Sequence, residues 1–132
     1  NRRFATLFSE GDPAGNVYVI DDENHLIRKI TPDGNVTTIL GPSEPGITGP
    51  YDLFSTSAIA TDKYGNLFFA VSGGVFERTP DGNIIRFAVG GVGESDGPLP
   101  LAAFRFIRGI AVDDHGTVFI TDNNRIRKIA WQ

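Results

Sequence analysis

Short apolar runs recur along the chain, and each is followed by a segment that carries basic side chains. The runs are Val17-Tyr18-Val19-Ile20, Leu67-Phe68-Phe69-Ala70 and Val118-Phe119-Ile120. They are rich in β-branched and aromatic residues, are bounded by glycine and aspartate, and are too short for helices, so each predicts a β-strand. Because apolar and polar residues do not alternate within them, we expect both faces of these strands to be buried.

Glycine-containing turns separate the apolar runs from further strands. The segments Asp62-Lys63-Tyr64-Gly65-Asn66 and Asp113-Asp114-His115-Gly116 precede two of the runs. Later in the repeats stand Thr31-Pro32-Asp33-Gly34-Asn35 and its twin Thr79-Pro80-Asp81-Gly82-Asn83. Proline presets φ for the first central position of a turn, and glycine can adopt the positive φ that such turns need. The turns predict hairpins, with first strands at 58–61 and 109–112, third strands at 26–30, 75–78 and 125–129, and fourth strands at 36–40 and 84–89.

The whole pattern repeats with a regular period. Gly15, Gly65 and Gly116 each stand just before an apolar run and follow one another after about 50 residues, a spacing typical of stacked units or propeller blades. Four antiparallel strands per repeat form the blade of a β-propeller. We therefore predict an all-β fold of about three four-stranded blades, a single domain or fragment whose blades cover residues 4–41, 57–91 and 107–132.

Both ends of the chain depart from the repeat. The third copy stops at Gln132, where its last turn and fourth strand are expected. Residues 4–8 fit the first strand of the first copy, but they also resemble the fourth strands, and a fourth strand here would complete a blade begun by the C-terminal strands. A half-ring of three blades would expose an apolar face at each end. Two alternatives stay open: two copies close a six-bladed ring, or the chain is a fragment of a longer propeller.

The composition excludes only a few classes of partner and site. The chain has 132 residues, 40% of them apolar, a net charge of −4 and no cysteine. The acidic balance disfavours nucleic acid as a partner, because binding to phosphates depends on a basic surface. Without cysteine there are no disulfides, thiolate metal sites or cysteine nucleophiles. No apolar run approaches the roughly 18 residues of a membrane span, so we expect no membrane insertion.

The tripeptide Asn24-His25-Leu26, in the context GNVYVIDDENHLIRKITPDGNVTTILG, resembles the signature of the NHL-repeat family. The third copy contains DNNRIRKI, and GESDG precedes it, which also resembles long NHL repeats of about 50 residues. The second copy departs from the pattern, with Val71-Ser72-Gly73-Gly74 in place of aspartate and asparagines. The resemblance implies a six-bladed propeller. Members of the family act as protein-binding scaffolds, sensor domains of bacterial surface receptors, RNA-binding modules and, less often, lyases.

Polar residues cluster where the second strand of a blade ends. Asp21 and Asp122 stand at this point in the first and third copies, where a carboxylate could coordinate a cation or substrate, or could accept backbone N–H bonds of the following turn. The only histidines, His25 and His115, are fewer than the three protein ligands typical of catalytic zinc. The predicted ligand-binding set is Asp21, Asn24, His25, Asp122, Asn123 and Arg125.

These residues form no convincing catalytic set, so we predict neither catalytic residues, a metal site nor a cofactor. The favoured hypothesis is a non-catalytic NHL-repeat β-propeller scaffold that binds a protein or carbohydrate ligand. The family resemblance places it at the cell surface or outside the cell. The alternative is a metal-dependent propeller enzyme, lyase-like or lactonase-like, with its site in the channel. A homodimer that closes a six-bladed ring is one of the two assemblies considered.

Overall fold

The computed structural model describes residues 6–21, 26–41, 56–71, 74–89, 107–122 and 125–129. In this part of the chain every regular element is a strand. The strands are β1 (Thr6–Gly11), β2 (Val17–Asp21), β3 (Leu26–Ile30), β4 (Val36–Leu40), β5 (Thr56–Thr61), β6 (Leu67–Val71), β7 (Gly74–Arg78), β8 (Ile84–Val89), β9 (Ile107–Val112), β10 (Val118–Asp122) and β11 (Arg125–Ile129).

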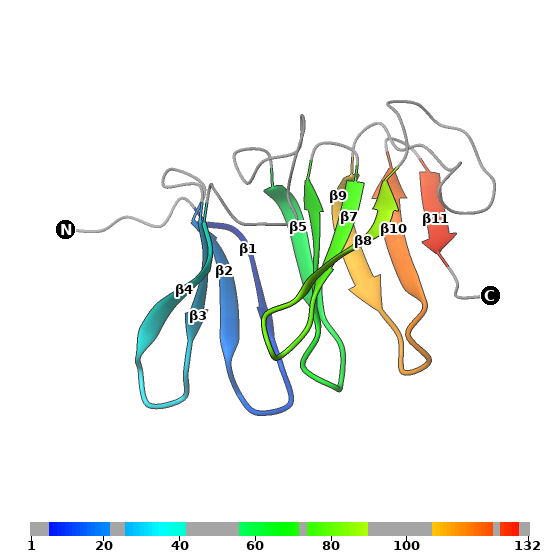
Figure 1. The fold of residues 1–132 in the computed structure, drawn as a ribbon. Coiled ribbons are helices and arrows are strands. Elements are labelled where there is room, and N and C mark those ends of the chain that lie inside the picture. Colours follow the sequence, from blue (N-terminus) through cyan, green and yellow to red (C-terminus); the bar gives the residue numbers. More distant parts are fainter. Residues whose placement is uncertain are drawn as a thin grey trace.

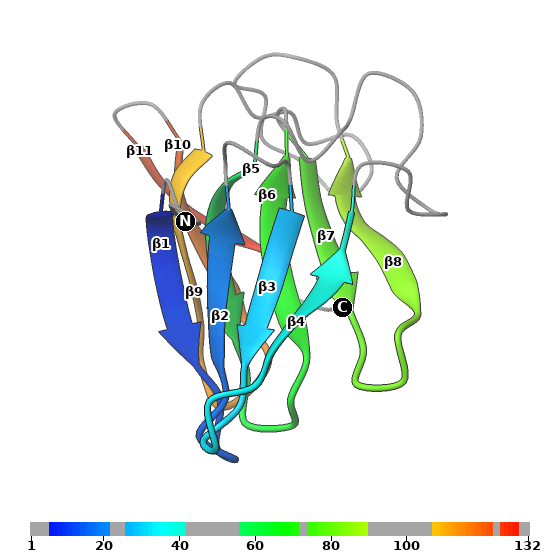
Figure 2. The same cartoon turned by 90° about the vertical axis from the view of Figure 1, so that its left-hand side faces the viewer.

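The strands form three separate antiparallel sheets, one for each sequence repeat. The first sheet has the order β1-β2-β3-β4, the second has β5-β6-β7-β8, and the third has β9-β10-β11. The strands β1, β5 and β9 lie side by side, and the sheets fan out from them (Figures 1 and 2). This is the arrangement of neighbouring propeller blades, with β1, β5 and β9 as the inner strands. The segment predicted as either a first or a fourth strand contributes to β1, the first strand of the first sheet.

Five hairpin turns close the lower end of the sheets in Figure 1. Each of these turns within the described residues has the same hydrogen bonds. The N–H of the first turn residue donates to the carbonyl of the fifth, and the glycine N–H donates back to the first carbonyl. The glycines have φ between 80° and 94°. This confirms the predicted hairpins and the need for glycine at these positions.

Each sheet has two faces, and neighbouring sheets pack together through them. We call the face turned toward the preceding sheet the leading face, and the face turned toward the following sheet the trailing face. Tyr18, Ile20 and Ile27 form the trailing face of the first sheet and pack against Leu67 and Phe69 on the leading face of the second. A second apolar cluster joins the trailing face of the second sheet to the leading face of the third, and it contains Phe68, Ala70, Val75, Val118, Ile120 and Ile129.

The expected burial of the apolar runs on both faces is confirmed for the second sheet, where residues 67–70 of β6 are all buried. In the first sheet residues 18–20 of the predicted run are buried, but Val17 is 37% exposed. For β10 the prediction is wrong, because Phe119 is only half-buried and Thr121 is exposed. The reason is positional: both residues lie on the trailing face of the third sheet, and no later sheet follows within the described residues.

Candidate functional site

The described members of the predicted ligand-binding set lie at the upper end of the first and third sheets, at the end of β2 and β10 and at the start of β11 (Figure 1). The structure describes Asp21, Asp122 and Arg125 from this set. Asn24, His25 and Asn123 lie outside the described residues. Asp21 and Asp122 end equivalent strands, but they belong to the two outer sheets of the three and have the second sheet between them.

Both aspartates are buried and paired with an arginine. Asp122 and Asp21 each have an exposed fraction of 0%. The Nη1 atom of Arg127 donates to Oδ2 of Asp122 at 2.9 Å, and Nε of Arg28 lies 3.4 Å from Oδ2 of Asp21. The two arginines are equivalent, because Arg127 pairs with Ile120 and Arg28 pairs with Val19 in the same hairpin register. These contacts favour a structural role for both carboxylates, and their part in ligand binding stays a prediction.

The second sheet replaces the ion pair with apolar residues at both positions. In the register of β6 and β7, Val71 stands where the other sheets have aspartate, and Phe76 stands where they have arginine. Phe76 is fully buried, and its ring stacks on Phe69 with 5.5 Å between ring centroids and 14° between ring planes. A lone buried aspartate or arginine would be strongly destabilising. The joint replacement therefore indicates that the two residues act as one structural unit.

Two further arginines, Arg125 and Arg108, stand near Asp122 in the register of the third sheet. Arg125 at the start of β11 pairs in register with Asp122 and has an exposed side chain. Arg108 lies on β9 at a register shift, because Ile107 pairs with Asp122 whereas Gly109 pairs with Thr121. Such a bulge bends the strand and redirects its side chains, and the side chain of Arg108 is exposed. Arg108 and Arg125 therefore give a basic end to one sheet of an acidic protein.

Sequence reasoning did not find Arg108, because the predicted first strand of the third blade began one residue later. The bulge depends on how β9 pairs with β10, which the apolar pattern does not encode. All three inner strands have a register shift near this end. An alignment of the three first strands by their hairpin register would have been the signal that could reveal Arg108. The shift is thus a repeated feature of the blades, and the arginine is specific to the third one.

The lower end of the sheets carries aspartates that stabilise the turns. The carboxylate of Asp12 accepts hydrogen bonds from the backbone N–H groups of Ala14 and Asn16 and from the hydroxyl of Tyr18. Although burial opposes the effect, the hydrogen bonds hold the pKa of Asp12 below its ordinary value. Burial and the contact with Asp12 raise the pKa of Tyr18 to about 12.

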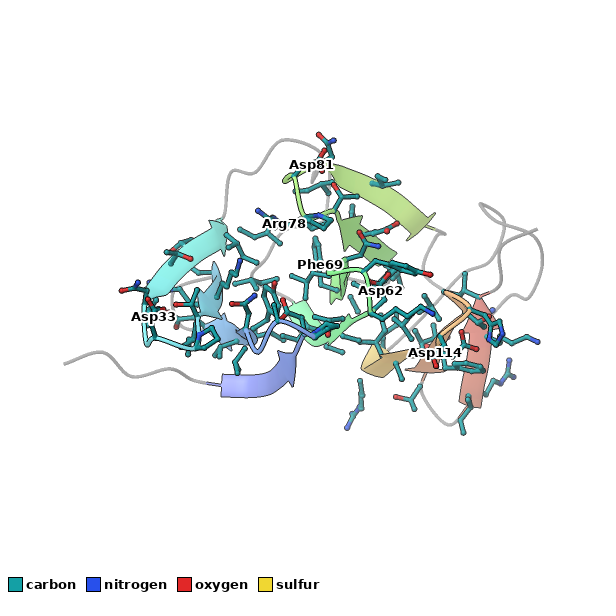
Figure 3. All side chains as sticks on the ribbon, turned by 90° about the horizontal axis from the view of Figure 1, so that it is seen from below. Asp33, Asp62, Phe69, Arg78, Asp81 and Asp114 are labelled. Carbon is teal, nitrogen blue, oxygen red and sulfur yellow. The ribbon has the colours of Figure 1, made fainter. Side chains whose placement is uncertain are left out.

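The acidic turns do not converge on one point. Asp33, Asp62, Asp81 and Asp114 belong to four different hairpins, and Figure 3 shows them spread over the lower end of all three sheets. Among the described residues no group of three or more histidine, cysteine, aspartate or glutamate side chains could hold a metal ion. The described residues also include no helix that is long and apolar enough to cross a membrane.

The chain was compared with protein families, curated proteins and solved structures. No protein-family model matches the chain, and no curated protein does. Among solved structures, virginiamycin B lyase from Staphylococcus aureus aligns with 98% of this chain at a TM-score of 0.67 and 16% identity. A protein of unknown function from Bacteroides thetaiotaomicron aligns with 92% at a TM-score of 0.70 and 21% identity, and a nutrient-binding protein from the same organism aligns with 92% at 0.69 and 21%.

The fold is a partial β-propeller. The structural neighbours are β-propeller-like proteins, and the three sheets of this chain align with a part of each. The chain spans 39% of the lyase, 32% of the protein of unknown function and 36% of the nutrient-binding protein. At these identities the likeness shows the fold alone, because one fold hosts many activities. The predicted all-β propeller architecture is thereby confirmed.

Proposed function

We propose that the chain is a non-catalytic binding module that recognises a protein or carbohydrate ligand through the upper end of its propeller sheets. The carrying observation is the pair of exposed arginines, Arg108 and Arg125, beside the buried Asp122–Arg127 ion pair. The ion pair anchors Arg127 on the same short strand as Arg125. Arginines on a rigid sheet are suited to bidentate hydrogen bonds with carboxylates, so the ligand is expected to carry acidic groups.

The same proposal includes the remaining residues of the predicted ligand-binding set. Asn24, His25 and Asn123 lie outside the described residues, and they remain candidates because in the sequence they directly follow the segments that form β2 and β10. One structural neighbour is a nutrient-binding protein, which supports ligand capture as the task of this chain. The likeness to NHL repeats adds a scaffold role, and together with that neighbour it favours the cell surface or the extracellular space.

Binding to two anionic probes tests the proposal. We expect the protein to bind polygalacturonate or poly-glutamate and to ignore neutral dextran, as measured by affinity electrophoresis at low and moderate salt. Loss of one charged hydrogen bond costs about 1.5–3 kcal/mol, so Arg125→Gln and Arg108→Gln should each weaken binding about tenfold or more. Lys63→Gln is the matched control, because Lys63 is exposed in a hairpin turn at the opposite end. Equal affinities for all three variants, or no binding to either anionic probe, would contradict the proposal.

The second candidate is a metal-dependent propeller enzyme, lyase-like or lactonase-like. The likeness to virginiamycin B lyase favours it. Such an activity requires inward-facing side chains from several blades, of which this chain supplies three sheets. Elemental analysis of the purified protein after dialysis distinguishes the candidates: a stoichiometric ion supports the enzyme, whereas selective binding of an anionic probe by a metal-free protein supports the binding module.

A further inference from the structure

The segment Thr-Pro-Asp-Gly-Asn occurs twice in the described part of the chain, in the turns that join β3 to β4 and β7 to β8. The first copy covers residues 31–35 and the second covers residues 79–83. Both contain an Asp-Gly bond, which rearranges to isoaspartate more readily than most bonds after aspartate, because glycine has no side chain to hinder the attack. Asp33 and Asp81 are exposed, and Figure 3 shows them at separate places on the outer edge of the lower end.

The rearrangement requires the backbone nitrogen of glycine to reach the side chain of the preceding aspartate. The nitrogen attacks Cγ of the protonated carboxyl group, a bond between N and Cγ forms, and the carboxyl OH leaves as water with the hydrogen of the N–H group. Water then opens the resulting succinimide ring, either at Cγ to restore aspartate or at the main-chain carbonyl to give isoaspartate. Isoaspartate adds a carbon atom to the main chain, so it would disturb a hairpin whose register is set by the turn.

The backbone of each turn holds the glycine nitrogen away from the aspartate side chain. The N–H of Gly34 donates to the carbonyl of Thr31 at 2.9 Å, and the N–H of Gly82 donates to the carbonyl of Thr79 at 2.9 Å. This bond closes a four-residue turn whose third residue is the aspartate, and the third residue of the common turn types has ψ of about 0°. Such a ψ places the glycine nitrogen beside the backbone nitrogen of the aspartate, whereas ring closure needs it beside Cβ. The attack therefore requires a rotation that breaks the hydrogen bond.

The side chains of each turn hold the carboxylate in its unreactive form. The hydroxyl of Thr31 donates to Oδ1 of Asp33, and Nδ2 of Asn35 donates to Oδ2 at 3.1 Å. The second turn repeats both contacts, with 3.2 Å between the amide nitrogen and the carboxylate oxygen. In both turns the hydrogen bond from the threonine hydroxyl is the main cause that holds the pKa of the aspartate below its ordinary value. An ionised carboxylate is a poor electrophile, because it carries no OH group that can leave as water.

We propose that these two turns protect their Asp-Gly bonds from rearrangement to isoaspartate, and that the hydroxyl of the first threonine is the positioning group that controls the protection. Asp33 and Asp81 are then modification sites that are closed in the folded hairpin and open when the hairpin unfolds. The third Asp-Gly bond of the chain, at 96–97, lies outside the described residues. The proposal does not depend on which ligand the upper end of the sheets binds.

Ageing of the folded and the unfolded protein tests the protection. The chain is incubated at neutral pH in buffer and in guanidinium chloride, and isoaspartate at Asp33 and at Asp81 is measured separately by peptide mapping with mass spectrometry. Because each turn must give up at least one hydrogen bond to a charged group, both sites should rearrange about tenfold or more slowly in the folded protein. Equal rates in the folded and the unfolded protein at either site would overturn the proposal.

The second turn serves as a control for the first within the same molecule. Thr31→Val keeps the branched shape and removes the hydroxyl, so in the folded protein it should speed the rearrangement at Asp33 about tenfold and leave the rate at Asp81 unchanged. Thr79→Val should give the reverse pattern, and Thr31→Ser, which keeps a hydroxyl, should retain the protection. A Thr31→Val variant that changes neither rate, or that raises both rates equally as general unfolding would, overturns the control by the threonine hydroxyl.

Discussion

The ion pair between Asp122 and Arg127 should be one of the most sensitive points of the fold. Both side chains are almost completely buried, with 0% and 8% of the side-chain surface exposed. The perturbation is Asp122→Asn, which keeps the shape of the side chain and removes its charge. Arg127 then keeps a buried positive charge whose carboxylate partner is gone. We expect this variant to be strongly destabilised, although the substitution only replaces one carboxylate oxygen with an NH2 group.

The size of the effect follows from the separation of the charges. At 2.9 Å and an effective dielectric constant of about 20, two unit charges attract each other by about 6 kcal/mol. Desolvation of the two ions offsets much of this attraction, so the pair contributes little net stability compared with apolar residues of similar volume. Removal of one partner leaves the desolvation of the other uncompensated, which costs about 3–5 kcal/mol.

The second sheet suggests the compensating change. The double variant Asp122→Val, Arg127→Phe copies the residues Val71 and Phe76 of that sheet. Urea unfolding at fixed protein concentration should give a loss of about 3–5 kcal/mol for each single variant and a much smaller loss for the double variant. The resulting coupling energy should change little with salt, because buried pairs are weakly screened. Losses below about 1 kcal/mol for the single variants, as for an exposed pair, would refute the structural role.

Three further predictions concern the lower end of the sheets. Burial raises the pKa of Glu77, so the folded state favours its protonated form; Glu77→Gln should raise the melting temperature at pH 7, and this gain should vanish as the pH falls below 4.5. Tyr18→Phe removes a hydrogen bond to the Asp12 carboxylate and should cost about 1.5 kcal/mol in urea unfolding at pH 7. Since the folded-state pKa of Tyr18 is raised to about 12, this difference should persist below pH 10 and disappear as the pH rises through 12. Gly34→Ala should cost about 1–2 kcal/mol because φ is +90° there, whereas Gly11→Ala, without positive φ, should be nearly neutral; equal losses would argue against backbone strain.

The sequence predicted the strands well because two strong local signals coincided. Glycine after proline and aspartate, as at Gly34 and Gly82, demanded positive φ and predicted two of the hairpins. Apolar runs between these turns then had the length of strands. A half-ring of three blades predicted an exposed apolar face at each end, and Ile126 lies on such a face, but the residues that form it were not predicted because they depend on the register of the last sheet.

The candidate site was less accessible to sequence reasoning. Asp21 and Arg28 stand seven positions apart, whereas Asp122 and Arg127 stand five apart, because the connection at 22–25 is longer than the one at 123–124. Only the hairpin register shows that the two pairs are equivalent. A carboxylate at a strand end therefore looked available for a ligand, although in the folded chain it is buried beside an arginine.

The two ion pairs lie on faces with different neighbours. Asp122 and Arg127 lie on a leading face that the second sheet covers, whereas no described sheet covers the leading face that carries Asp21 and Arg28. Both pairs are nevertheless buried, because Asp21 and Arg28 are 0% and 8% exposed and Asp122 and Arg127 are 0% and 9% exposed. We therefore expect double-mutant cycles in urea unfolding to give coupling energies of similar size at the two pairs. A coupling energy between Asp21 and Arg28 below about 1 kcal/mol, as for an exposed pair, would show that the strength of the pair depends on the neighbouring sheet and not on the hairpin that holds both residues.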